Sequence, residues 1–143
     1  MLRDIDPILS PDLLHALRAM GHGDEIVIAD ANFPAEGLGP RCIRADGSSA
    51  SDMLRAVLSV LPLDTFVPDP AHSMAVVDDP DAIPEAVADF QRIIDDTADH
   101  PARIVPLERF AFYERAASAF AVIQTGERRL YGNIILKKGV IAP

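Results

Sequence analysis

The sequence predicts an α/β fold, with residues 1–143 forming a single domain in which a mainly parallel sheet is flanked by helices. Two observations favour this fold class. Stretches with an apolar residue every three or four positions alternate along the chain with short β-branched runs, as in α/β proteins. A length of 143 residues suits one domain, and no repeat, low-complexity tract or linker divides the chain.

The first helix is expected over residues 11–20, because Ser10 is a good capping residue and is followed by a proline at the first helical position. Gly21 comes directly after the apolar stripe, and we expect it to close the helix in the left-handed conformation. Residues 25–30 are apolar, β-branched and few, which is typical of a buried strand. Asp30 then lies at the end of that strand.

The rest of the chain continues the alternation. Residues 120–125 and 130–136 flank a polar segment that contains glycine, as the two strands of a hairpin do. Ser51 is the expected cap of the second helix. The other expected elements are strands at 42–44, 64–67, 74–77 and 104–107, and helices at 51–61, 84–94 and 110–117.

Composition and charge narrow the classes of partner. The 22 acidic residues exceed the 13 basic ones and give a net charge of −9, so a nucleic-acid partner is not expected. The single cysteine, Cys42, cannot form an internal disulfide and fits a reducing compartment. The N-terminus carries acids where a signal peptide carries bases, and no apolar run is long enough to span a membrane. We therefore expect a soluble cytoplasmic protein.

His22 is the first candidate for chemistry. Glycines on both sides leave its ring little local cover, and Asp24 together with the end of a helix favours its protonated form. A histidine that titrates near neutrality can donate and accept protons, as general acid–base catalysis requires. The same spacing also fits a helix-capping or surface histidine, so the pattern alone leaves both interpretations open.

Polar residues at strand ends are the second set of candidates. Asp30 ends an apolar strand, where open α/β sheets bind ligands, although a loop-capping aspartate would look the same. Tyr131 and Asn133 flank Gly132, and on a strand they would share one face. A hydroxyl and an amide side by side suit sugar hydroxyls, but such a pair is equally common on an exposed surface.

Tyr113 lies in an aromatic-rich segment, so its ring is expected to be buried while its hydroxyl finds a partner in the core or in a pocket. Its charged neighbours Arg109, Glu114 and Arg115 fit an exposed helix face. His72 lies in a loop and is undecided. No nucleotide-binding or metalloprotease motif occurs, and no pair of candidate ligands has metal-binding spacing on one element, so neither a cofactor nor a metal is expected.

Five segments, in order and nearly end to end, resemble the fucose mutarotase and ribose pyranase family. They are Met20-Gly21-His22-Gly23-Asp24-Glu25-Ile26, Asp30-Ala31-Asn32-Phe33-Pro34, Arg44-Ala45-Asp46-Gly47, Phe110-Ala111-Phe112-Tyr113-Glu114-Arg115-Ala116 and the stretch from Tyr131 to Val140. The resemblance implies a cofactor-free isomerase that exchanges the α and β anomers of a free monosaccharide. It also implies a ring-shaped homodecamer whose sites use neighbouring subunits.

The resemblance also implies roles for single residues. His22 matches the family's proton donor, Asp30 its partner across the sugar, and Tyr113 serves a second proton transfer or contacts a hydroxyl. Further matches to substrate-binding positions are Asp64, Met74, Arg109, Tyr131, Gly132 and Asn133. The Tyr-Gly-Asn and Phe-Tyr-Glu-Arg segments favour the fucose branch. The alternatives are a D-ribose pyranase and a non-catalytic protein that binds monosaccharides or assists their transport.

Overall fold

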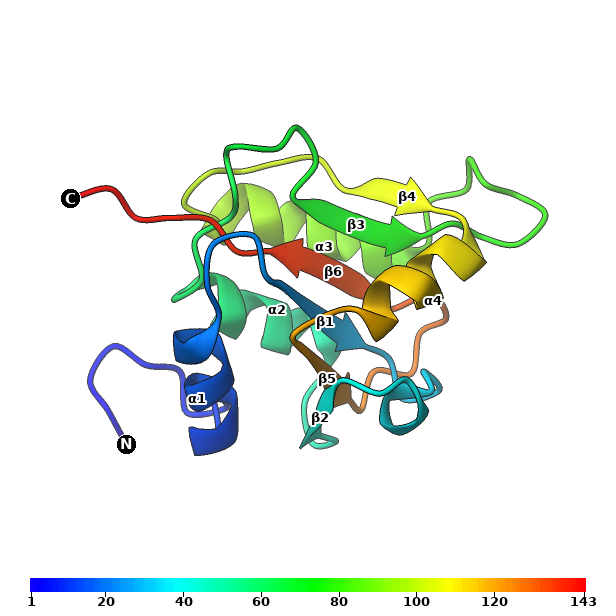
Figure 1. Cartoon of the computed structure of the whole chain (residues 1–143). Helices are drawn as coiled ribbons and strands as arrows, with labels where there is room; N and C mark the ends of the chain where they lie inside the picture. The colour runs from blue at the N-terminus through cyan, green and yellow to red at the C-terminus, as the bar shows by residue number, and fades with distance from the viewer.

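The computed structural model describes residues 1–143 and contains one six-stranded sheet with helices on both faces (Figure 1). The strands are β1 (Glu25–Ala29), β2 (Arg41–Ala45), β3 (Ala71–Met74), β4 (Val105–Leu107), β5 (Ala121–Thr125) and β6 (Ile134–Lys137). The helices are α1 (Pro11–Ala19), α2 (Ala50–Leu58), α3 (Glu85–Thr97) and α4 (Arg109–Ala117), with a short 3-10 helix, η1 (Ala35–Gly37). None of the helices is both long and apolar enough to cross a membrane.

The strand order is β2-β5-β1-β6-β3-β4, and the sheet is mixed. Strand pairs β1/β5, β2/β5 and β3/β4 are parallel, whereas β6 is antiparallel to both β1 and β3. The α/β prediction with a mainly parallel sheet is confirmed. The expected hairpin is wrong, because β1 lies between β5 and β6. Residues 126–133 form a loop that steps over β1 instead of a tight turn.

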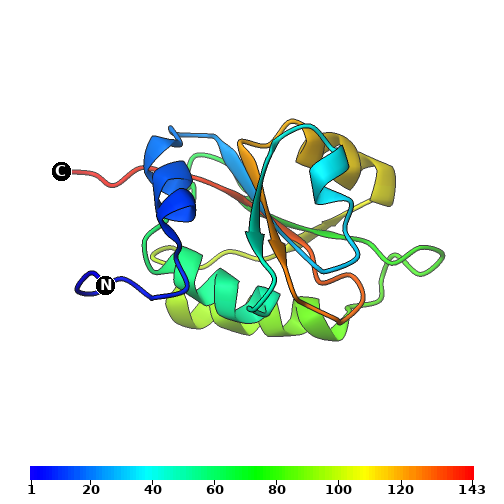
Figure 2. The same ribbon diagram turned by 90° about the horizontal axis from the view of Figure 1, so that it is seen from below.

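Helices cover the two faces of the sheet unequally. Helices α1, α2 and α3 pack on one face, and α4 with η1 covers the other (Figure 2). Strand β1 serves both layers, since Ile26 and Ile28 join the larger core while Val27 and Ala29 join the smaller one around Phe112. Burial on both faces explains why this strand is continuously apolar instead of alternating.

Several local predictions need correction. Ser10 caps α1 as expected, but the cap of α2 is Ser49, whose side chain accepts from the Asp52 N–H; Ser51 lies inside the helix. Gly21 is not left-handed; Gly23, two residues on, has φ +85°. In both cases the predicted position is wrong by two residues, because a second serine or a second glycine lies close by and suits the same role.

Two predicted strands are also misplaced. Residues 64–67 do not form a strand; only Leu63 makes an isolated bridge, to Lys138. The strand expected at 74–77 ends at Met74 and instead begins at Ala71. Ladder bonds from β6 and β4 decide the position of β3, so the local sequence does not determine it.

Candidate functional site

A cleft of about 250 Å³ opens at the edge of the sheet where β1 and β3 end and β6 begins. Ligands of open α/β sheets bind in such a crevice beyond the carboxyl ends of the strands. Polar, aromatic and apolar side chains share its wall, which suits a small molecule with many hydroxyls. The lining residues are Asp30, Asn32, Phe33, Met74, Val77, Arg109, Tyr113, Leu130, Tyr131 and Asn133.

The polar floor of the cleft is the pair Asp30 and Asn133. The Asn133 Oδ1 accepts from the Asp30 N–H at 2.8 Å, and the Asn133 Nδ2 donates to the Asp30 Oδ2 at 2.9 Å. The Asn32 N–H donates to the other carboxylate oxygen at 2.9 Å. Burial raises the pKa of Asp30 although these hydrogen bonds act in the opposite direction. The carboxylate is held in one orientation and retains acceptor capacity for a ligand hydroxyl.

The loop between β5 and β6 requires a glycine beside this pair. A Cβ at Gly132 would lie 2.7 Å from the Glu127 Cγ and 3.4 Å from the Asp30 Cβ. Tyr131 is left-handed, with φ +57°, and its hydroxyl accepts from the Val77 N–H at 3.2 Å. A non-glycine residue in this conformation is sterically costly, so the surrounding loop must hold it.

Aromatic residues of α4 and of the turn before η1 form one wall of the cleft. The Tyr113 ring stacks on Phe33 with centroids 5.5 Å apart, and Phe33 meets the buried Phe112 edge to face at 5.9 Å. The Arg109 guanidinium lies over the Phe110 ring, 4.7 Å from its centroid. This packing gives Tyr113 a fixed ring and leaves its hydroxyl at the half-buried lining of the cleft.

His22 lies elsewhere, at the opposite end of β1. Its Nε2 is 3.1 Å from the Asp64 Oδ1, and that carboxylate side chain is only 2% exposed whereas the His22 side chain is 44% exposed. Burial acts to raise the pKa of Asp64, but hydrogen bonds from the Phe66 N–H and from His22 outweigh it and leave the pKa below its usual value. A fixed carboxylate therefore orients an accessible imidazole.

The turn that carries His22 is held by the end of β6. The Gly23 N–H donates to the Lys138 carbonyl, and the Lys138 N–H donates to the Asp24 carbonyl, both at 2.8 Å. The Lys138 ammonium donates to the carbonyls of Leu17 and Met20 at the end of α1. The orientation of the His22 turn thus depends on residues more than a hundred positions away in sequence.

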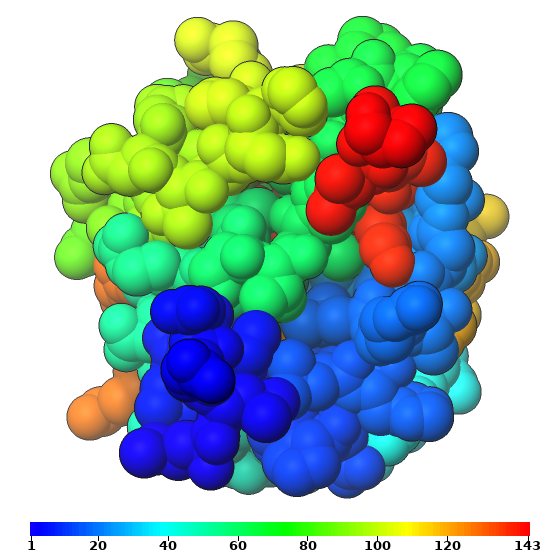
Figure 3. Space-filling model, turned by 90° about the vertical axis from the view of Figure 1, so that its left-hand side faces the viewer, coloured from blue at the N-terminus to red at the C-terminus, as the bar shows by residue number.

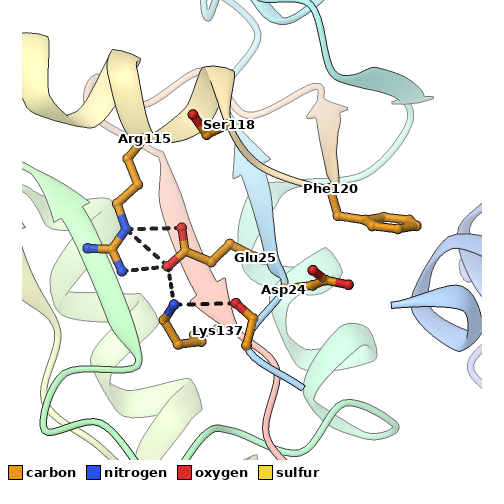
Figure 4. Close-up of a pocket in the computed structure, with 7 residues that line it drawn as sticks. Asp24, Glu25, Arg115, Ser118, Phe120 and Lys137 are labelled. Carbon is orange, nitrogen blue, oxygen red and sulfur yellow. Dashed lines mark hydrogen bonds and ion pairs between the residues drawn. The ribbon is translucent and has the colours of Figure 1, made fainter. Parts of the chain in front are cut away.

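Beside this turn is a polar pocket of about 560 Å³ around Glu25 (Figure 4). Arg115 of α4 and Lys137 of β6 both pair with the Glu25 carboxylate, with the Lys137 Nζ 3.0 Å from Oε1. Burial acts to raise the pKa of Glu25, and the two cations together leave it below its usual value. Lys137 also donates to the Gly23 carbonyl at 3.3 Å.

The structure divides the candidate residues into two groups. Six lie together in the cleft: Asp30, Met74, Arg109, Tyr113, Tyr131 and Asn133, with Gly132 buried beside them. His22 and Asp64 pair with each other at the far end of β1. Asp24, the expected partner of His22, instead accepts from the Gly21 N–H at 2.7 Å.

Some residues at these two places were not candidates. Phe33, Val77 and Leu130 line the cleft, and Phe66 contacts His22. Phe33 could have been predicted as a cleft residue, because it lies three positions after Asp30 in a segment that resembles the family. His72 proves to be buried in β3, with its ring nitrogens 3.2 Å and 3.0 Å from the carbonyl oxygens of Val105 and Asp69, away from the cleft. No group of three or more His, Cys, Asp and Glu side chains is placed to hold a metal ion.

Solved structures include several that are similar over almost the whole chain. A fucose mutarotase from Streptococcus pneumoniae, in complex with L-fucose, is 42% identical with a TM-score of 0.91 and covers 99% of this chain and 100% of its own. FucU from Bifidobacterium longum is 43% identical with a TM-score of 0.91, covering 98% and 100%. A putative sugar binding protein is 45% identical with a TM-score of 0.94, covering 99% and 97%.

RbsD from Bacillus subtilis, complexed with D-ribose, shares the fold at 24% identity and a TM-score of 0.74, covering 99% of this chain and 100% of its own. Residues 3–141 match the RbsD / FucU transport protein family. The matched range includes every element of the sheet, the cleft and the His22 turn. The chain therefore belongs to the RbsD / FucU family.

Proposed function

We propose that this protein, acting as a single domain over residues 1–143, is an L-fucose mutarotase that interconverts the α and β anomers of the free sugar. The observation that carries the proposal is the cleft in which Asp30, Asn133 and two tyrosines supply fixed partners for sugar hydroxyls. The 42% identity to a fucose mutarotase, across both full chains, supports the choice of reaction.

The reaction needs two proton transfers. The anomeric hydroxyl loses its proton while the bond from the anomeric carbon to the ring oxygen breaks and the ring oxygen gains a proton; the open aldehyde then rotates and closes by the reverse path. His22, oriented by Asp64, donates to the ring oxygen. Tyr113 or a bound water takes the proton of the anomeric hydroxyl. Asp30, Tyr131 and Asn133 bind the other hydroxyls, with Arg109 and Met74 completing the wall.

One chain cannot bring His22 to the cleft, because β1 separates them. His22 precedes the strand and Asp30 follows it, and the five extended residues of β1 alone span roughly 16 Å. A monosaccharide cannot reach across that distance. We therefore infer that each site combines the cleft of one copy with His22 of another, which agrees with the homodecamer that the family resemblance implies. A cytoplasmic location, where free sugars are metabolised, belongs to the same proposal.

Two alternatives remain distinct from this proposal. A D-ribose pyranase would use the same proton transfers, but the apolar part of the cleft wall, with Phe33, Met74 and Leu130, offers contact to the methyl group that fucose has and ribose lacks. The 45% identical relative is a putative sugar binding protein, which favours a non-catalytic sugar-binding function as the second alternative. Such a protein would keep the cleft and would not need a proton donor.

Exchange NMR separates the three functions. Magnetisation transfer between anomer signals is measured with L-fucose, D-ribose and D-galactose, for the unaltered protein, His22→Ala and the exposed control His15→Ala. Acceleration is expected with L-fucose, reduced ~10²- to 10⁴-fold in His22→Ala and unchanged in His15→Ala. Acceleration with D-ribose alone would choose the pyranase, and binding without acceleration would choose the non-catalytic protein.

A further inference from the structure

We propose that Phe66 is a substrate-contacting residue: it enters the cleft of the next copy beside His22 and covers the bound sugar. This inference rests on the proposed function, because it requires a site shared by two copies. The occupant of the cleft is thus the monosaccharide, and the surface that closes it belongs to a second copy of this chain.

Phe66 and His22 form one unit. The two rings contact each other with centroids 5.1 Å apart and an interplanar angle of 58°. The Phe66 N–H donates to the Asp64 Oδ1 at 3.0 Å, and the same oxygen is 3.1 Å from the His22 Nε2. Because one buried carboxylate oxygen fixes both residues, any arrangement that places His22 at a sugar also brings Phe66 there.

Nothing in its own chain buries Phe66. Phe66 is 72% exposed. Figure 3 views the end of the molecule where the segment around residues 65–70 lies beside the C-terminal residues. Single exposed apolar residues are common on protein surfaces and carry no argument alone. Contact with the proposed proton donor is the independent observation, because it places this ring at the edge of the reaction.

The cleft lacks the cover that such a ring would supply. Its volume of about 250 Å³ lies below the ~300–1,000 Å³ of sites that enclose most of a ligand. Leu130 and Val77 on its lining are 71% and 43% exposed, so the rim is apolar as well as open. An apolar ring from the next copy matches this rim, and it would exclude water from the proton transfers.

The expected contact is with the carbon-bound hydrogens of the sugar, since Asp30 and Asn133 already supply polar partners for its hydroxyls. A 6-deoxy sugar such as fucose presents a methyl group as well, which adds apolar surface. Phe66 would then contribute to substrate affinity more than to the chemical step. Loss of the ring should raise KM more than it lowers kcat.

A single-tryptophan variant tests the placement. The chain contains no tryptophan, so Phe66→Trp introduces a single indole fluorophore beside His22. We expect blue-shifted emission in the assembled protein and a further, saturable change when L-fucose is added, with half-saturation at the KM measured by exchange NMR. Emission typical of a solvent-exposed indole, unaffected by L-fucose, would overturn the proposal.

A kinetic pair gives a second, independent test. Phe66→Ser should raise KM for L-fucose about tenfold or more. The matched control Phe120→Ser removes another exposed phenylalanine, which lies at the pocket around Glu25, and should leave KM unchanged (Figure 4). Light scattering of both variants records whether assembly persists. An unchanged KM in an assembled Phe66→Ser protein would refute the role of Phe66.

The two proposals fail differently. If the unaltered protein accelerates exchange of no sugar, the mutarotase function is wrong. Suppose instead that the unaltered protein accelerates exchange and that His22→Ala removes the acceleration, while the indole emission of Phe66→Trp does not respond to L-fucose. The mutarotase function then stands, and only the placement of Phe66 is wrong.

Discussion

At the scale of single residues, Asp64 has the most connected position in the proposed mechanism. Its buried carboxylate holds His22 and the Phe66 N–H, so its charge and its geometry both act on the proton donor. Asp64→Asn keeps a similar shape but removes the charge-assisted hydrogen bond. We expect kcat for anomer exchange to fall about tenfold or more, with a smaller change in KM.

Asp24→Asn is the matched comparison for that variant. Asp24 is also close to His22 in sequence, but its carboxylate accepts from the Gly21 N–H and makes no hydrogen bond with the imidazole. Exchange NMR at saturating L-fucose should show near-normal kcat for Asp24→Asn. A larger loss of kcat in Asp24→Asn than in Asp64→Asn would show that Asp24, and not Asp64, orients His22.

Gly132 gives a prediction about binding. In Gly132→Ala the new methyl would lie 2.7 Å from the Glu127 Cγ and 3.4 Å from the Asp30 Cβ, so the loop has to shift next to the polar floor of the cleft. We expect KM for L-fucose to rise about tenfold, because Asp30 and Asn133 lose their alignment. Gly37→Ala, at a position with open space, should bind normally. An unchanged KM for Gly132→Ala would show that the loop absorbs the methyl.

The residues of the site were foreseeable from the sequence to different degrees. Asp30 and Asn133 have types and positions that suggest hydroxyl binding, and the structure brings them within 2.9 Å of each other. The partner of His22 was not foreseeable from spacing, since Asp24 is two residues away and Asp64 forty-two. Only the tertiary fold selects between two aspartates of equal chemistry.

At the scale of elements, β6 supports the His22 turn through Lys137. Its ammonium bonds the Gly23 carbonyl and pairs with Glu25, which keeps Arg115 as a partner if the lysine is lost. Lys137→Met should therefore fold while letting the turn move. We expect kcat to fall about tenfold with KM nearly unchanged.

Two further variants test whether the loss of kcat in Lys137→Met acts through His22. Lys137→Arg keeps the positive charge and should recover most of kcat. In a His22→Ala background, Lys137→Met should cause no further loss, because residues that act through one another are not additive. A full additional loss in that background would indicate a general structural role for Lys137.

The loop between β5 and β6 gives a prediction about pH. Arg129 bonds Glu127 and lowers its pKa from 4.5 to about 2 despite burial, and it also reaches Ser51 and Asp89. Since the pKa in the folded state is the lower one, this stabilisation is present above pH 4.5 and is lost as the pH falls toward 2. A shift of this size corresponds to at most about 3 kcal/mol in the free energy of unfolding.

Urea unfolding between pH 3 and 7, at one fixed protein concentration, measures this contribution. Glu127→Gln should be less stable than the unaltered protein at pH 7 and should lose less stability on acidification. The exposed Glu114→Gln should follow the unaltered protein at every pH. Parallel acid dependence for Glu127→Gln and the unaltered protein would contradict the assignment.

Most elements were predictable from the sequence, and pairing between them was not. Capping at Ser10 and the apolar run of β1 are local, so they could be found without the fold. The antiparallel β6 follows β5 in sequence yet pairs with β1 and β3, because the central β1 must complete its hydrogen bonds on both sides. Such requirements depend on the whole sheet, and the hairpin pattern carries no information about them.

At the scale of the whole molecule, the shared site can be tested by mixing two variants, each of which impairs one part of the site. His22→Ala retains the cleft and Asp30→Asn retains the proton donor. If sites form between copies, joint refolding in equal amounts should restore about one quarter of the sites, because each half has an even chance of being intact. Exchange NMR measures the recovery. No recovery, with assembly verified by light scattering, would place both residues in one chain.

The cleft and His22 lie at opposite ends of β1, so the way in which copies assemble sets how many complete sites can form. In the proposed shared site, each copy would give its histidine to one neighbour and receive a histidine from another for its own cleft. In a closed ring every cleft is matched, so the number of working sites equals the number of copies. An open row always ends with one cleft without a histidine and one histidine without a cleft. Closure of the ring would therefore decide whether every copy is used.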